Sequence, residues 1–202
     1  VDVAEGDRVR VTGTVTEFNG ETQIAVRDAG AIQVVTPRAL TPEQVKASAV
    51  AVELPAAATI GTGTTAQPDL ERYEGMLVRF PQTLSITEQF NLDRFNEIRL
   101  AAGGRPETFT NEFEPNTAAN AAYLAQTAAR SITYDDGQNA QNLPVENLDG
   151  FGPTYGTASA PRMGDTVTGL TGTLGFGPTG AYRVRSIDDG DNRFVTANPR
   201  PA

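Results

Sequence analysis

An internal repeat of a strand-and-turn pattern is the feature of this sequence that most narrows its fold. The run GDRVRVTGTV at residues 6–15 is followed by Phe18, and the run GDTVTGLTGTL at residues 164–174 is followed by Phe176. In both copies the Phe lies eleven residues after the Asp. The Thr-Gly-Thr core is displaced by one residue, which requires a β-bulge or a local change of register. The repeat predicts two related β-structures or a duplication within one. The alternative is that Gly-Asp and Thr-Gly-Thr recur only because they are common in β-turns.

Each copy is typical of a strand, a tight turn and a return strand. Residues 8–11 alternate Arg and Val, the period of a half-buried strand. Asn19-Gly20 is a strong hairpin signal, because both residue types tolerate a positive φ. We expect the return strands at residues 22–26 and 182–187.

The rest of the pattern predicts a mainly β fold made of OB-fold-like barrels with one inserted Ala-rich helix. That helix is expected at about residues 116–130 (NTAANAAYLAQTAAR), where Ala dominates and Asn or Thr supplies the N-cap. This pattern predicts four segments along the chain. Residues 1–54 are the terminal strands of an incomplete first barrel, or strands packed onto the second; 55–69 are a linker; 70–196 are the second barrel; and 197–202 are a linker running onward.

Composition excludes several kinds of chemistry. The chain has no His and no Cys, which removes the usual general base, thiol nucleophiles, ordinary zinc sites and disulfides. Lys46 is the single lysine, and the net charge of −9 repels phosphate backbones at long range. This balance suits a secreted protein, although an acidic cytoplasmic protein has a similar composition. No apolar run approaches the roughly 20 residues of a membrane-spanning helix.

Six short segments carry a family resemblance. They are YEGMLV at residues 73–78, TEQFNL at 87–92, EIRLAAGGR at 97–105, GDRVRVTG at 6–13, YDDG at 134–137 and NPRP at 198–201. The sequence resembles the middle region of large secreted bacterial endonucleases, whose catalytic domain is C-terminal and of the endonuclease/exonuclease/phosphatase type. The resemblance implies a secreted, OB-like segment that precedes the catalytic domain and contacts it. No position here matches the catalytic residues of that family, so any Mg²⁺ or Ca²⁺ belongs to the parent, and this segment needs no cofactor.

OB barrels bind single strands by stacking bases on aromatic rings within a basic groove. Arg99 alternates with Ile98 and Leu100, so its side chain is expected to point away from the core. In the competing interpretation, the Phe residues close the barrel end and the arginines pair with nearby acids. The first candidate set is Arg79, Phe90, Arg94, Phe95, Arg99 and Arg105. The second, on the last strand, is Tyr182, Arg183 and Arg185.

Two acidic turns are candidates for metal sites. Residues 188–192 (DDGDN) offer oxygen ligands suited to calcium, but they lack the Asp-x-Asp-x-Asp-Gly order and the distal Glu of the known loop. The turn at residues 135–137 offers fewer ligands. Turn composition explains both segments, and no metal site is predicted.

These observations favour a non-catalytic nucleic-acid-binding or substrate-positioning module of an extracellular endonuclease, acting on single- or double-stranded DNA or RNA. Two alternatives stay open: a structural spacer that orients the catalytic domain, and a carbohydrate- or surface-adhesion β-domain. Arginines and aromatic rings on one exposed face favour nucleic acid. Scattered positions favour a spacer, and aromatic rings alone in a groove favour sugar.

Overall fold

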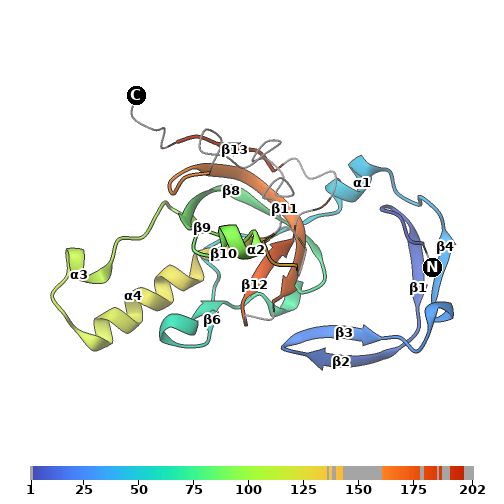
Figure 1. The fold of residues 1–202 in the computed structure, drawn as a ribbon, viewed down its shortest axis with the longest axis horizontal. Coiled ribbons are helices and arrows are strands. Elements are labelled where there is room, and N and C mark those ends of the chain that lie inside the picture. Colours follow the sequence, from blue (N-terminus) through green and yellow to red (C-terminus); the bar gives the residue numbers. More distant parts are fainter. Residues whose placement is uncertain are drawn as a thin grey trace.

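Five strands close into a small β-barrel (Figure 1). The computed structural model describes residues 2–135, 137, 140–142, 161–177, 180–185, 187 and 192–197. The barrel strands are β8 (Leu77–Glu88), β9 (Ile98–Ala102), β10 (Ser131–Asp135), β11 (Thr166–Phe176) and β12 (Tyr182–Arg185). They pair in the order β8-β9-β10-β12-β11, and β11 returns to β8; β10 and β12 are parallel and the other barrel pairs antiparallel. The predicted mainly β, OB-fold-like class is confirmed, and helices are few among the described residues.

The barrel interior is filled by side chains from all five strands. Along β8, the buried positions fall on alternate residues, as expected for a strand with one face toward a core. Full burial of each such side chain contributes about 1.5–3 kcal/mol to the free energy that stabilises the fold. The largest fully buried side chains of the strands are Val78, Phe80, Leu84, Ile86, Ile98, Leu100, Tyr134, Val167, Leu170, Leu174 and Val184.

A bulge in β11 changes which residues face inward. Val167 is buried, and the next inward residue is Leu170 rather than residue 169. The register against β8 shifts between Thr168 and Leu170, and Gly169 lies there with a φ of +75°. Glycine tolerates this left-handed backbone without strain. The bulge therefore restores the inward phase for the second half of the strand.

The segment expected to be a linker is held against the barrel. Residues 55–69 include two short strands, and the side chain of Gln67 is buried. Its Oε1 accepts the N–H of Tyr182 at 2.8 Å, and its Nε2 donates to the carbonyl of Gly180 at 2.8 Å. The peripheral elements are β5 (Val50–Ala51), parallel to β8; β13 (Phe194–Val195), antiparallel to β11; the pair β6 (Thr59–Ile60) and β7 (Gln67–Pro68); and the short helices η2 (Gly63–Thr65) and η3 (Glu71–Tyr73).

The Ala-rich helix forms within one residue of each expected end. α4 (Thr117–Ala129) lies between β9 and β10 in the chain and projects from the barrel (Figure 1). Asn116 caps it by accepting the N–H of Ala119 at 2.9 Å. The preceding short helix, α3 (Phe109–Glu112), contacts it through the tilted rings of Phe109 and Tyr123, whose centres are 5.7 Å apart. The Tyr123 hydroxyl also donates to the Glu107 carbonyl at 2.6 Å.

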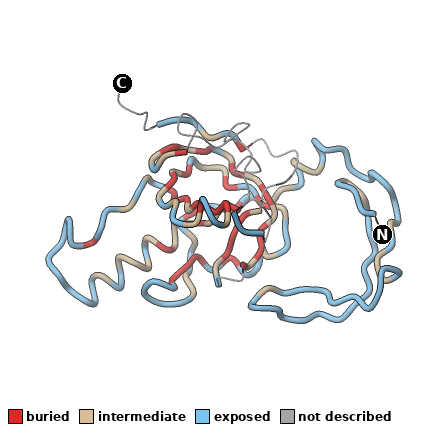
Figure 2. The backbone as a smooth tube through the Cα atoms, viewed as in Figure 1, coloured by how far each residue is buried: buried red, intermediate tan, exposed pale blue. Residues whose placement is uncertain are grey.

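Residues 2–47, here called the N-terminal unit, lie beside the barrel and are exposed almost throughout (Figure 2). Asn19 and Gly20 have positive φ values of 54° and 86°, so the predicted hairpin turn is confirmed. The hairpin touches the barrel where Thr22 N–H donates to Glu74 Oε1 at 2.6 Å. The unit contains the antiparallel pairs β1 (Arg8–Val11) with β4 (Ile32–Thr36) and β2 (Thr14–Phe18) with β3 (Glu21–Ala25), and the helices η1 (Ala29–Ala31) and α1 (Pro42–Ala47).

Candidate nucleic-acid interface

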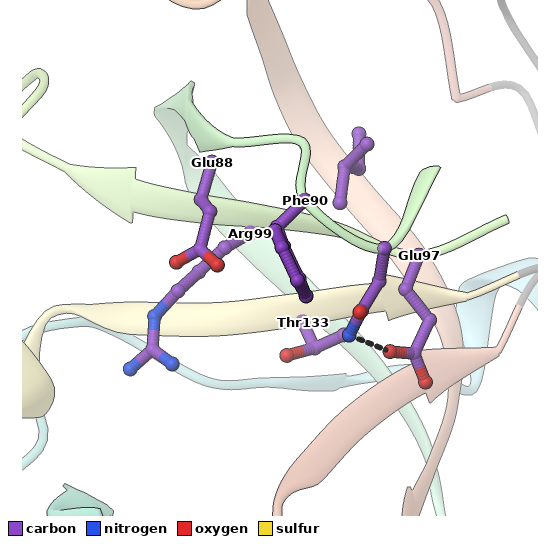
Figure 3. Close-up of a pocket in the computed structure, with 7 residues that line it drawn as sticks. Glu88, Phe90, Glu97, Arg99 and Thr133 are labelled. Atoms are coloured by element: carbon purple, nitrogen blue, oxygen red, sulfur yellow. Dashed lines mark hydrogen bonds between the residues drawn. The ribbon is translucent and has the colours of Figure 1, made fainter. Parts of the chain in front are cut away.

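A shallow cleft lies on the outer face of β9 and β10, beside the loop that follows β8 (Figure 3). This loop contains the short helix α2 (Leu92–Phe95). The cleft volume of about 70 Å³ is far below the roughly 300–1,000 Å³ of pockets that enclose a small molecule, so a ligand would lie across it. The second and third strands of OB folds, with the loop before them, are where oligonucleotides and oligosaccharides bind. The lining residues are Glu88, Phe90, Asn91, Glu97, Ile98, Arg99 and Thr133.

Phe90 presents its ring to solvent over this cleft. The ring is 84% exposed, while the neighbouring Leu92 is only 4% exposed and occupies the buried position of the loop. Figure 3 shows the Phe90 ring between Arg99 and Glu97, pointing toward Thr133. Burial of a Phe side chain lowers the free energy by about 1.5–3 kcal/mol relative to exposure to water. The exposed Phe90 ring lacks this stabilisation, and a base or sugar stacked on the ring would supply part of it.

Arg99 lies on the outer face of β9, as the alternation predicts. Its neighbours Ile98 and Leu100 are buried, and Arg99 is half-exposed. It stands opposite Thr133 on β10 and Glu88 on β8. Within the described part of the chain, the Arg99 guanidinium forms no ion pair. The competing interpretation expected it to pair with a nearby acid, and the structure does not show that pair.

A buried ionic cluster lies under the cleft and fixes its loop. The Arg183 guanidinium contacts Glu97 Oε1 at 2.6 Å and also binds the Asp135 carboxylate. Glu97 in turn accepts a hydrogen bond from Asn91 Nδ2 at 2.9 Å. Burial raises the pKa of Glu97, because lost hydration and the nearby Asp135 outweigh attraction to Arg183. The cluster thereby connects the β8–β9 loop to β10 and β12.

Arg94 and Phe95 lie on α2 but do not line the cleft. The Arg94 guanidinium stacks 4.8 Å from the centre of the Phe95 ring, and its Nε donates to Gln141 Oε1 at 2.9 Å. The Asn142 N–H also donates to the Arg94 carbonyl, at 2.8 Å. These contacts direct Arg94 toward residues 140–142.

The remaining two arginines of the first set are exposed and lie away from the cleft. Arg79 is on β8, and its guanidinium covers Gly169 of the β11 bulge. Arg105 follows the end of β9, in the connection to α3. The structure therefore brings together only Phe90 and Arg99 of the six predicted residues.

The second candidate face requires correction. Tyr182 and Arg183 are 2% and 5% exposed, so neither is available to a surface ligand. The Tyr182 hydroxyl donates to Glu71 Oε2 at 2.6 Å, and burial raises the pKa of that hydroxyl. Arg185 is half-exposed and pairs with Glu21 at 3.2 Å. β12 is covered on both faces, which a sequence reading of one solvated face misses.

Acidic groups suited to metal binding do not gather among the described residues. Asp135 is held by Arg183 and by the N–H of Gly137, at 2.6 Å to its Oδ1. Of the acidic turn at residues 188–192, the first four residues lie outside the described part of the chain. Its last residue, Asn192, is buried and accepts the Thr171 N–H at 2.8 Å. Among the described helices, none has the length and apolar character needed to span a bilayer.

Comparison of the chain with known protein families, curated proteins and solved structures finds no match. The case for a function therefore depends on the cleft and its surroundings.

Proposed function

We propose that this chain is a non-catalytic module of an extracellular endonuclease that binds single-stranded nucleic acid across the outer face of β9 and β10. The observation that carries the proposal is the exposed ring of Phe90 beside the Arg99 guanidinium. A ring in this position offers a stacking surface to a base, and the guanidinium offers charge and hydrogen bonds to the adjoining phosphate. The parent enzyme is inferred only from the sequence resemblance described above.

Charge limits the affinity expected for such a site. The chain carries a net charge of −9, and Glu88 lines the same cleft as Arg99. Long-range attraction to phosphate is therefore absent, and one arginine neutralises about one phosphate. We expect weak binding in which base stacking contributes more than charge.

The first test is fluorescence anisotropy of a labelled single strand, titrated with the full chain at low and moderate salt. Replacement of Phe90 by Ala removes the stacking surface, which is worth about 1–3 kcal/mol per base, so the affinity should fall about 5- to 150-fold. Phe113→Ala, an exposed ring in the turn before α4, is the matched control and should leave binding unchanged. Equal losses in both variants would contradict the proposed site.

The charge contribution is tested separately through Arg99→Gln. This variant should reduce the slope of log affinity against log salt by about 0.7, the value for one phosphate contact with a single strand. Arg105→Gln is the control, because Arg105 is exposed but does not line the cleft. The absence of saturable binding by the wild-type chain at low salt would leave the spacer function in its place.

Glu88 supports a second candidate ligand, an oligosaccharide. Its carboxylate lies beside Arg99 in the cleft, where it would accept hydrogen bonds from sugar hydroxyls while Phe90 packs on the ring (Figure 3). A sugar ligand carries no phosphate, so its binding should persist at high salt. Salt-insensitive binding that Phe90→Ala abolishes would favour the sugar.

A further inference from the structure

The two copies of the sequence repeat begin with the same hydrogen-bonded turn. Asp7 accepts the N–H of the residue three positions earlier at 3.0 Å, and that of Arg38, beyond β4, at 2.7 Å. Asp165 accepts the N–H three positions earlier at 2.8 Å, and that of Ala197, beyond β13, at 3.0 Å. In the first copy, the two strands β1 and β2 occupy the place of the single strand β11. In each copy the start of this strand pairs antiparallel with the strand that follows the hairpin: β1 with β4, and β11 with β13.

The hairpins of the two copies also match at one close backbone approach. A Cβ at Gly13 would overlap the carbonyl of Ala25 and the γ-methyl of Ile24. A Cβ at Gly172 would overlap the same pair of groups on β12, the γ-carbon of Val184 and the carbonyl of the next residue. Both positions admit only glycine, because a neighbouring strand crosses the site that a side chain would occupy.

The one-residue displacement between the copies has a structural cause. Gly169 is the extra residue of the β11 bulge. Before it, Val9 corresponds to Val167; after it, Val11 corresponds to Leu170. Apart from this bulge, the repeat is a repeat of structure, with the strand, the hairpin and the strand after the hairpin in the same order.

The two copies differ sharply in burial. Leu174 and Val184 are fully buried in the barrel, whereas their counterparts Val15 and Ile24 are 69% and 53% exposed. Most of the large hydrophobic side chains exposed in the described structure belong to the N-terminal unit. In the barrel, β8 pairs with β11 and β10 pairs with β12, while β2 and β3 pair only with each other among the described residues. An apolar face of this kind marks an interaction surface.

We infer that the N-terminal unit is the closing part of a second barrel, and that its apolar face binds a three-stranded β-meander like β8-β9-β10. The first strand of this meander pairs antiparallel with β1 and β2, and its third strand pairs parallel with β3. The meander precedes the hairpin in the complete copy, which assigns its counterpart to the same polypeptide, on the N-terminal side of β1. Its inward residues cover Val15 and Ile24.

A duplication experiment tests this inference. A second copy of residues 70–161 is joined ahead of the full chain, and amide hydrogen exchange of β2 and β3 is compared in the two proteins. We expect exchange in β2 and β3 to slow at least about tenfold when the added strands close the barrel. The control carries Leu84→Asp and Leu100→Asp in the added copy only, and should give no slowing, because charges at inward positions prevent packing.

Two variants of the N-terminal unit locate the contact. In the extended protein, Val15→Asp should abolish the slowed exchange, while Thr16→Asp, on the opposite face of β2, should retain it. Unchanged exchange of β2 and β3 in the extended protein, whether or not the added copy is itself protected, overturns the inference. Concentration-dependent protection of the unmodified chain together with dimer formation also overturns it, because a second copy would then cover the face.

Discussion

At the scale of single residues, the Arg183 guanidinium is shared by two buried carboxylates, those of Glu97 and Asp135. Removal of one partner from a buried ion pair leaves charge without compensation, at a cost of about 3–5 kcal/mol. We therefore expect Arg183→Met to lower the free energy of unfolding by about that amount, measured by urea denaturation. The control is Arg185→Met, whose half-exposed pair with Glu21 should contribute at most about 1 kcal/mol. Comparable losses in both would contradict a special role for the buried cluster.

The same cluster predicts a dependence on pH. Burial holds the pKa of Glu97 above its ordinary value of 4.5, so the folded chain binds this proton more tightly than the unfolded chain does. Its contribution to stability is then fully present below pH 4.5 and is lost as pH rises through the raised pKa. Relative to wild type, Glu97→Gln should gain stability over this rise in pH, measured by urea denaturation at several pH values. A difference that stays constant across the range would contradict the raised pKa.

At the scale of elements, the close approach of β11 and β12 depends on Gly172. A methyl group at this position would meet the backbone of β12, which cannot move without separating the strands. Overpacking of this kind costs about 1–3 kcal/mol or more, so Gly172→Ala should lower the melting temperature of the barrel. Gly13→Ala makes the equivalent clash in the exposed N-terminal unit and should leave the barrel transition unchanged. Circular dichroism during heating distinguishes these results.

Local sequence predicted the elements whose signals are local. The hairpin turn at Asn19-Gly20 and helix α4 both form where turn chemistry and Ala content indicate. The linker expectation for residues 55–69 did not anticipate the hydrogen bonds of Gln67, because its partner Tyr182 lies 115 residues away. No periodicity within a short window reports such a pairing.

Only part of the candidate site could be predicted, because some of its residues meet through long-range pairings that leave no local signal. Arg99 could be placed outward from the alternation of β9 alone, and Phe90 from its position in a polar loop. Thr133 and Glu97 join the cleft only through the pairing of β9 with β10 and the contact of Glu97 with Arg183. The prediction of an exposed Arg183 was wrong. An arginine in a strand is ordinarily solvated, but here the side chain is buried against two carboxylates that are distant in sequence.

At the scale of the whole molecule, burial is concentrated in the barrel and nearly absent from the N-terminal unit (Figure 2). The barrel has a continuous apolar interior, while the unit is joined to it by polar contacts at the hairpin turn, including Thr22 with Glu74 and Glu21 with Arg185. The candidate interface belongs to the barrel, so its geometry does not require the unit to be covered.

Closure of the barrel has a kinetic consequence. β8 and β11 pair across a large sequence separation: the Thr83 and Thr168 hydroxyls, 2.8 Å apart, are separated by 85 residues. Pairings of this kind require a long chain segment to lose its freedom before any contact compensates, so they form slowly. The β8–β9 pair, by contrast, is local and can form early. Topology therefore predicts that the local hairpins β8–β9 and β11–β12 form before the pairing of β8 with β11 closes the barrel.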